Sequence, residues 1–211
     1  IERAEALADY LAELHRQSLP ARLHTRDIRD TVGSGEGIFG LTDSYPPDDP
    51  VAPPGRLMQI ELQAVRQRWN KRHLAERARR THGDFHPYNI LFREGTDFSL
   101  LDCSRGGAGE PADDVTSLSI NYLFSALLAR GQLSGPLRQV WDRFWGTYLE
   151  RSRDPQLLEL TPLYFAWRAL VLASPVWYPD VDRGVRERLL GFAERLLDGA
   201  SFDPARIDAL M

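Results

Sequence analysis

Cysteine, lysine and long apolar runs are all scarce in this chain of 211 residues. Its one cysteine, Cys103, excludes an internal disulfide and fits a reducing compartment, so we expect a cytoplasmic protein. The longest apolar stretch, Leu163 to Val176, is interrupted by Arg168 and Pro175 and is too short and too polar to span a membrane. These features argue against a disulfide-stabilised fold and against a membrane protein.

Basic residues are almost all arginine, because Lys71 is the one lysine among 26 basic side chains. Acidic residues number 30, which gives a net charge of −4 and no case for a nucleic-acid partner. The basic stretch from Arg66 to Arg80 is interrupted by Glu76, as is typical of a solvated helix face. A hydrophobic content of 43% is enough for one domain with its own core.

One short segment concentrates polar side chains. Residues 82–89 read His-Gly-Asp-Phe-His-Pro-Tyr-Asn, and two apolar runs separated by a polar turn follow, which predicts a β-hairpin. Such a hairpin returns Asp102 to the side of Asn89. An amide oxygen and a carboxylate are hard ligands that magnesium accepts beside water and phosphate. A curled loop stiffened by Pro87 can aim Asp84 at the same point.

The pattern His-x-Asp-x-x-x-x-Asn, followed by an Asp at a strand end, resembles the catalytic loop and metal-binding strand of the aminoglycoside phosphotransferase and choline kinase families, distant relatives of protein kinases. The resemblance implies that Asp84 takes or orients the proton of an acceptor hydroxyl. It implies that Asn89 and Asp102 hold Mg²⁺ on the phosphates of the nucleotide. It also implies that His82 is structural and bonds to backbone around the loop.

Two further segments support the resemblance. Residues 109–115 are similar to the family's Gly-x-Pro-x-x-Asp-Leu-Ala segment, which implies that Asp114 bonds the loop backbone and holds its shape. A carboxylate there is also favoured by the dipole at a helix N-terminus. The Leu-Ala-Glu-Leu-His sequence ending at His15 is similar to a helix end just after the linker between the family's two lobes. Thr116 and Cys103 depart from the usual family residues.

The expected fold class is mainly α with a small β-hairpin (α+β), which resembles the helical C-terminal lobe of the protein-kinase-like fold. Residues 20–55 are rich in Gly, Pro and Asp and predict a long loop or lid. A Gly-x-Gly-x-x-Gly match at 35–40 lacks a preceding strand, so we interpret it as a surface loop. Helical periodicity is expected over 2–17, 56–80, 113–130, 156–174 and 183–198, and from Pro136 onward.

The resembling families have an amino-terminal lobe with a phosphate-covering loop and a lysine that reaches the nucleotide phosphates. Here the loop begins as early as His82, and Lys71 lies in an arginine-rich helical stretch. We therefore expect residues 1–211 to be a single C-terminal catalytic lobe. The N-terminal nucleotide-clamping lobe is absent from this chain, so the lobe alone should be inactive. The alternative is a natural one-lobe protein without the clamp.

The resemblance implies a phosphotransferase that uses ATP or GTP with Mg²⁺. Its partners would be the nucleotide and a small hydroxylated molecule such as an aminoglycoside, an amino-alcohol or a sugar. Trp177, Tyr178 and Asp180 are candidate acceptor-binding residues in a predicted loop, because aromatic faces and carboxylates attract cations. Other candidate acids and aromatics are Glu150, Asp154, Glu159, Asp182, Trp141, Trp145, Tyr164 and Trp167.

Two other functions stay open. A non-catalytic kinase-like binding module is favoured by the missing clamp and opposed by the full set of Asp84, Asn89 and Asp102. A metal-dependent hydrolase is a more distant alternative, since alternation along a strand would place His82, Asp84 and His86 on one face as a zinc-type cluster. The proline that follows and the lack of a further histidine downstream argue against it.

Overall fold

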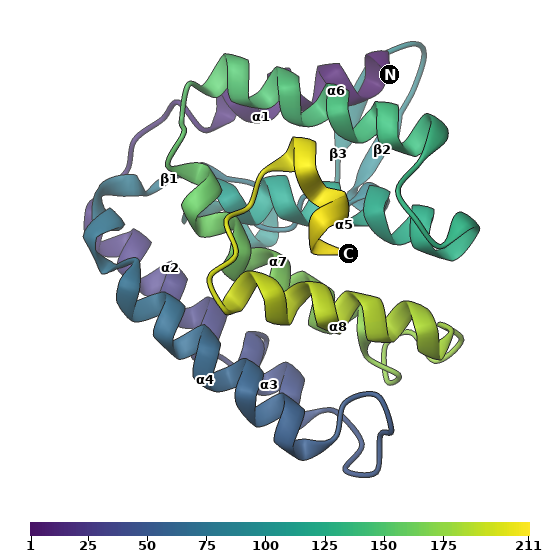
Figure 1. Ribbon diagram of the computed structural model, residues 1–211. Helices are drawn as coiled ribbons and strands as arrows, with labels where there is room; N and C mark the ends of the chain where they lie inside the picture. Colours follow the sequence, from purple (N-terminus) through teal and green to yellow (C-terminus); the bar gives the residue numbers. More distant parts are fainter.

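The computed structural model describes the backbone of residues 1–211 and every side chain except those of residues 21, 25, 75 and 76. Most of the chain is helical, and two antiparallel pairs of short strands complete it (Figure 1). This confirms the predicted mainly α class with a small β component. The α-helices are α1 Glu2–Leu14, α2 Ala21–Gly33, α3 Ile38–Asp43, α4 Pro54–Asn70, α5 Pro111–Arg130, α6 Gly135–Ser152, α7 Leu157–Ala173 and α8 Arg183–Leu197. The strands are β1 Arg79–Thr81, β2 Ile90–Phe92, β3 Phe98–Leu100 and β4 Gly107–Gly109, and the 3₁₀ helices are η1 Arg72–Arg77, η2 Pro87–Asn89, η3 Cys103–Arg105 and η4 Pro204–Leu210.

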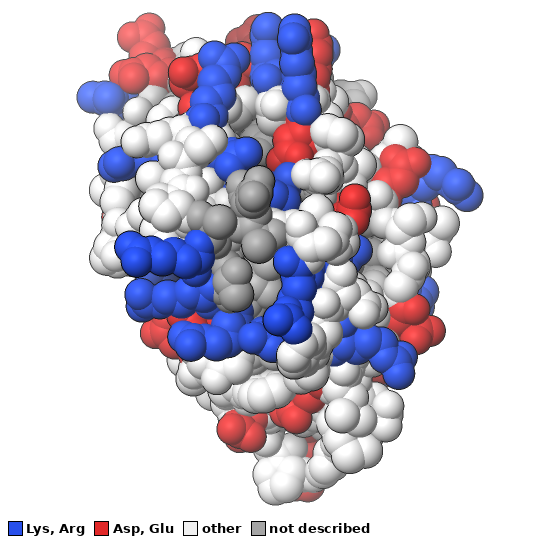
Figure 2. Space-filling view, turned by 90° about the vertical axis from the view of Figure 1, so that its left-hand side faces the viewer, with Lys and Arg blue, Asp and Glu red and all other residues white. Residues whose placement is uncertain are grey.

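Helices α5 and α7 form the centre of the molecule. Figure 1 shows α1 alongside α6, and α7 between α5 and α8, with α2, α3 and α4 to one side. Among the described residues, no helix combines the length and apolar character needed to cross a membrane. Figure 2 shows a face on which blue Lys and Arg side chains gather, and red Asp and Glu side chains are also present on it.

Aromatic side chains of α6, α7 and the C-terminal segment form part of the core. Trp141 and Trp145 each pack against Phe165 at a ring-centroid distance of 6.2 Å, and Phe202 lies 4.9 Å from Phe165. Each such ring contributes roughly 1.5–3 kcal/mol when it is fully removed from water. The helical spacing of the two tryptophans is therefore a core pattern and not part of a binding surface.

Helix α7 continues through Pro162, where a proline removes one backbone donor. The donor that is lost would have bonded the carbonyl of Leu158, four residues earlier. The hydroxyl of Thr161 donates to that carbonyl instead, at 3.0 Å. A side chain thus replaces the missing backbone bond and the helix is not split.

The prediction of a long loop over 20–55 is wrong for most of its length, since α2 and α3 occupy much of it. Buried Ile28 and Val32 give α2 an apolar face, and only short irregular stretches flank α3. Two of the glycines allow a close approach of the backbone: a Cβ at Gly37 would overlap the carbonyls of Asp30 and Thr31. A Cβ at Gly40 would likewise overlap the backbone of Gly35. At these two positions glycine marks tight packing and not a loop.

The helix expected over 56–80 ends at Asn70, because η1 and β1 follow it. Strand β1 pairs with β4 in antiparallel register, with Arg79 opposite Gly109 and Thr81 opposite Gly107. Strand β4 has the sequence Gly-Ala-Gly, which carries no strand signature. This pairing brings the start of α5 beside the segment that follows β1.

Candidate functional site

Loop 82–89 lies between β1 and the β2–β3 hairpin. The hairpin pairs Ile90 with Leu100, and the amide of Leu101 donates to the carbonyl of Asn89 at 2.9 Å. The chain therefore returns to the end of the loop one residue before Asp102. Asp102 has a left-handed backbone conformation (φ 49°, ψ 60°), and its carboxylate accepts a hydrogen bond from the Ser104 hydroxyl at 2.5 Å.

Asp114, in the first turn of α5, holds the start of loop 82–89. Its fully buried carboxylate accepts the backbone N–H groups of His82 at 2.7 Å and Gly83 at 2.8 Å. A third contact, at 3.1 Å, is with Nε2 of His15, whose other ring nitrogen meets the hydroxyl of Tyr148 at 2.8 Å. The Leu-Ala-Glu-Leu-His segment thus supports the loop through α1 and α6.

His82 ties the same loop to the hairpin. Its Nε2 lies 3.1 Å from the carbonyl oxygen of Leu101, and its Nδ1 lies 3.3 Å from the backbone nitrogen of Asp84. These two partners require Nε2 to be the donor and Nδ1 the acceptor. Both ring nitrogens of this buried side chain are therefore engaged with backbone, as a structural role demands.

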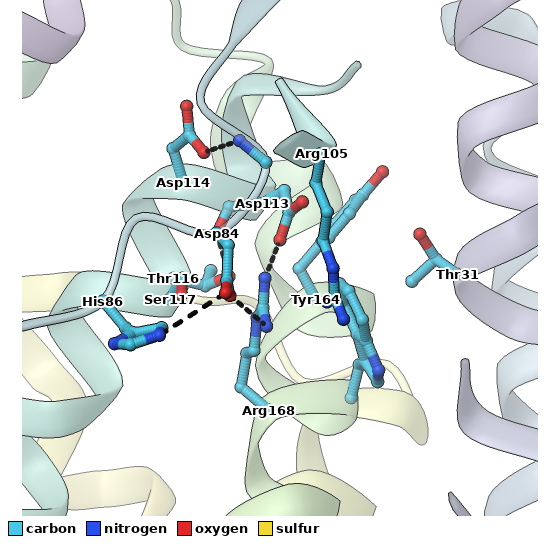
Figure 3. A network of polar contacts seen from close by, with 12 residues as sticks. Thr31, Asp84, His86, Arg105, Asp113, Asp114, Thr116, Ser117, Tyr164 and Arg168 are labelled. Atoms are coloured by element: carbon cyan, nitrogen blue, oxygen red, sulfur yellow. Dashed lines mark hydrogen bonds and ion pairs between the residues drawn. The ribbon is translucent and has the colours of Figure 1, made fainter. Parts of the chain in front are cut away.

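Asp84 is surrounded by hydrogen-bond donors and positive charge (Figure 3). Its carboxylate lies 3.4 Å from Nε2 of His86, 3.6 Å from Nη1 of Arg168 and 3.4 Å from Nδ2 of Asn89. Burial by itself raises the pKa of Asp84, but the hydrogen bond from His86 and the charge of Arg168 outweigh burial. The pKa therefore lies below its ordinary value. The carboxylate is ionised at neutral pH and serves as a hydrogen-bond acceptor.

Sequence reasoning missed Arg168, which α7 places between two carboxylates. It pairs with Asp84 and more closely with Asp113, and its guanidinium lies 4.0 Å from the ring centroid of Trp167. Nε of Arg168 is buried without a partner among the described residues. The available signal was an arginine within the apolar run 160–173 of α7, since such a charge is costly unless it is paired.

Two other carboxyls, those of Asp113 and Asp27, have a raised pKa, in contrast to Asp84. Burial raises the pKa of Asp113 to about 6, against the opposing charge of Arg168. Burial, and then the charge of Asp113, raise the pKa of Asp27 to about 7. This shift occurs although Asp27 accepts hydrogen bonds from the Tyr164 hydroxyl at 2.6 Å and from the backbone N–H of Glu110 at 3.1 Å. Around neutral pH the site therefore combines an ionised carboxylate with carboxyls that are partly protonated.

Asn89 and Asp102 are suited to a hard cation. The amide nitrogen of Asn89 donates to the carbonyl of Asp84 at 3.0 Å, so its oxygen is the end left for a ligand role. Asp102 is exposed and supplies a carboxylate at the end of the hairpin. Magnesium commonly takes one or two such protein oxygens and completes its shell with water and phosphate. The donor set fits Mg²⁺.

The structure does not have the arrangement of His82, Asp84 and His86 that the predicted zinc-type cluster requires. Strand β1 ends at Thr81, so His82, Asp84 and His86 do not alternate along a strand. Within the part of the chain that the structure describes, no three His, Cys, Asp or Glu side chains are grouped so as to hold a metal. The prediction that the three side chains share one face of a strand is therefore wrong.

A cavity of about 360 Å³ has Asp84 in its wall, and we call it the Asp84 cavity. Trp177 and Tyr178 line it, as do His86 and Tyr88 of the loop, whereas exposed Asp180 is not among its lining residues. The other walls come from the 35–44 segment, α5 and α7. Two of the three residues predicted for acceptor binding therefore share a cavity with Asp84, and the third does not.

The remaining candidate acids lie elsewhere. Asp154 pairs with Arg77 at 2.6 Å, Glu159 lies 3.7 Å from Lys71, and Asp182 caps α8 by accepting the N–H of Gly184 at 2.7 Å. These acids have structural partners, and none of them lines the Asp84 cavity.

The comparisons with known proteins support the resemblance drawn from the loop. A family model described as the phosphotransferase enzyme family matches residues 2–154. No curated protein matches the chain. The matched span contains Asp84, Asn89, Asp102 and Asp114 but ends before α7, so the α7 side of the Asp84 cavity lies outside it.

Proposed function

This chain belongs to the phosphotransferase enzyme family, and from that premise we propose that it is the C-terminal catalytic lobe of a small-molecule kinase. The reaction would transfer the γ-phosphoryl group of ATP or GTP to a hydroxyl of an aminoglycoside, an amino-alcohol or a sugar-like compound. One observation carries the proposal: a single loop presents the ionised Asp84 to a cavity and continues through Asn89 into the hairpin that ends at Asp102.

Asp84 is the residue that meets the acceptor. Since its pKa is lowered, its carboxylate is ionised and accepts a hydrogen bond from the acceptor hydroxyl, which aims the oxygen at phosphorus. A weakly basic carboxylate takes the proton only as the new O–P bond forms and the hydroxyl becomes acidic. Orientation is therefore the main contribution of Asp84, and proton acceptance follows it.

Asn89 and Asp102 would hold the magnesium ion through the amide oxygen and the carboxylate. When bound, the ion neutralises negative charge on the phosphoryl group during transfer. The hydrogen bonds from Asn89 to the backbone and carboxylate of Asp84 keep the acceptor-facing and metal-facing residues in one unit. Asp114 and His82 preserve that unit by fixing the backbone from His82 to Asp84.

The nucleotide clamp would lie outside these residues. The one lysine of the chain, Lys71, follows α4 and lies 3.7 Å from Glu159. In protein kinases the lysine that reaches the nucleotide phosphates lies on a β-strand, so Lys71 does not match it. We therefore expect residues 1–211 alone to be inactive, and to require an N-terminal lobe for turnover.

Nucleotide turnover with magnesium on the longest natural polypeptide that contains these residues tests the proposal. Hydroxylated amines, aminoglycosides, sugars and amino-alcohols should be supplied as separate pools. We expect acceptor-stimulated release of ADP or GDP. Turnover should fall by at least ~10²-fold with Asp84→Asn and should be abolished by Asp102→Ala. Asp97→Ala is the control, since Asp97 is exposed in the hairpin turn and its carboxylate pairs with Arg93.

The outcomes separate the candidate functions. Unchanged turnover in Asp84→Asn would remove Asp84 from its role. The absence of both turnover and magnesium-dependent nucleotide binding would favour the non-catalytic binding module. Tightly bound zinc in the purified protein would favour the hydrolase.

A further inference from the structure

The Asp84 cavity has mainly apolar walls. Leu41 of α3, Ile120 of α5 and Leu172 of α7 all line it, and each is at most 7% exposed. Trp167 adds an indole held in place by a hydrogen bond from Nε1 to the carbonyl of Glu36 at 2.9 Å. Walls of this kind bind a ligand through apolar surface, and a few polar groups set its orientation.

Exposed aromatic rings stand at the same cavity. Trp177 is 60% exposed and Tyr88 is 80% exposed, although both are large and line the cavity. Tyr178, which also lines the cavity, packs its ring edge-on against Phe124 of α5 at a centroid distance of 5.6 Å. Exposed aromatic surface beside a cavity is typical of a binding site.

The charges in the wall cancel one another. Asp84 pairs with Arg168 at 3.6 Å and Glu36 pairs with Arg105 at 3.0 Å, so two acids face two arginines. A polycation would have to displace Arg168 from Asp84, and breaking that mostly buried pair is costly. The Glu36–Arg105 pair is exposed, and Asp113, the second partner of Arg168, does not line the cavity. The lining therefore holds equal numbers of acids and arginines and offers no excess negative charge to a multiply charged amine.

A few polar groups remain available to a neutral ligand. The side-chain amide of Asn121 donates to the carbonyl of Ser117 at 2.8 Å, so its oxygen is the end that is left to accept a bond from a hydroxyl. Asn121 lines the cavity together with Asp84. Two acceptors on apolar walls suit a molecule that has hydroxyls on one edge and an apolar face.

We infer that the acceptor is an uncharged hydroxylated molecule with a flat apolar face, of the aryl glycoside or alicyclic alcohol class. Its face stacks on Trp177 and its reacting hydroxyl meets Asp84. A polycation such as an aminoglycoside is not the acceptor. The inference rests on the proposed function for the role of Asp84. The cavity, about 360 Å³, is near the small end of the roughly 300–1,000 Å³ range of ligand pockets, so the acceptor is a small molecule.

Calorimetric titration with three probes tests this inference without nucleotide or turnover. The probes are phenyl β-D-glucopyranoside, methyl β-D-glucopyranoside and kanamycin, at 0.15 M ionic strength as a roughly physiological condition. The two glucosides share their free hydroxyls and differ in the apolar face. We expect the phenyl compound to bind at least ~10-fold more tightly than the methyl compound, as burial of an aromatic ring implies. Kanamycin should bind more weakly than the phenyl compound.

Variants locate the binding. Trp177→Ala should abolish the preference for the phenyl compound, and Trp177→Phe should keep most of it. Trp69→Ala is the matched control, because Trp69 is 54% exposed on α4 and does not line the cavity. Equal binding of the two glucosides, no binding of the phenyl compound, a preference that survives Trp177→Ala, or tighter binding of kanamycin would overturn the inference. A kinase that prefers kanamycin would refute the acceptor class and leave the phosphotransfer proposal standing.

Discussion

Aspartates of this site differ in chemistry because their neighbours differ. Asp84 has donors on several sides and a lowered pKa, whereas Asp113, buried beside Asp114, has a pKa raised to about 6. Asp114 accepts two backbone N–H groups. Such divergence lets one small region hold an ionised hydrogen-bond acceptor, a carboxyl with a raised pKa and a structural anchor.

Removal of the Asp114 carboxylate should be among the most destabilising single changes in the site. Asp114→Ala leaves two loop N–H groups and the His15 ring buried without an acceptor, so we expect the free energy of unfolding to fall by roughly 3–5 kcal/mol. Urea denaturation measures this. Asp9→Ala, which removes an exposed partner of Arg151, should cost at most ~1 kcal/mol. Equal effects of the two changes would contradict the anchoring role.

At the scale of elements, amino-acid composition gave a wrong prediction where packing between helices decides the structure. Glycine in the 35–40 segment suggested a loop, yet the chain enters α3 there and folds tightly against α2. A Cβ at Gly40 would overlap the backbone of Gly35. Both glycines line the Asp84 cavity, so the same close approach shapes one of its walls.

Gly40→Ala should therefore destabilise the protein although alanine favours helices. We expect a loss of roughly 1–3 kcal/mol, as for an overpacked core, together with weaker binding in the Asp84 cavity. Gly33→Ala, at the end of α2 with open space around its Cβ, should be neutral or stabilising by up to ~1 kcal/mol. Thermal and urea unfolding of the pair measure the contrast, and a neutral Gly40→Ala would mean that the turn can open.

At the scale of the whole molecule, buried polar groups join segments that are distant in sequence. Asp27 of α2 accepts hydrogen bonds from Tyr164 of α7 and from the backbone of Glu110, just before α5. The buried carboxylate of Glu110 in turn binds His24 and Arg77. Helices α2, α5 and α7 are therefore connected by carboxyls as well as by apolar packing.

The raised pKa of Asp27 makes stability depend on pH. An unfolded Asp has a pKa near ~3.9, whereas folded Asp27 has a pKa of about 7, so the folded state binds more protons between these values. The Asp27 contribution to stability therefore falls as pH rises from about 4 to about 7.

Asp27→Asn, which mimics the protonated form, should gain stability over the native protein as pH increases from 5 to 8. The gain should be no steeper than about 1.4 kcal/mol per pH unit. Urea denaturation at the two pH values measures it. A variant whose stability tracks that of the native protein at both pH values would show that Asp27 titrates normally.

The sequence predicted the local parts of the fold and site and missed the distant ones. The hairpin was predictable because one continuous stretch specifies it, and the same stretch contains Asp84, Asn89 and Asp102, whose roles stay predictions. The β1–β4 pairing was not, since three residues of Gly-Ala-Gly carry no pattern. Arg168 was missed for the same reason: its partners on loop 82–89 and α5 lie far from it along the chain, and only the packing of α7 brings them together.

The tryptophans differ in burial, and this difference separates their fluorescence emission. Trp141 and Trp145 are at most 1% exposed, whereas Trp177 is 60% exposed at the Asp84 cavity. The core indoles emit from an apolar environment and the exposed one from water. Excitation at the red edge of the absorption band therefore selects Trp177, above a constant background from Trp69. A compound that enters the cavity would change this red emission at once, together with the emission of Trp167 in the cavity wall, whereas the emission of Trp141 and Trp145 would change only when the core unfolds.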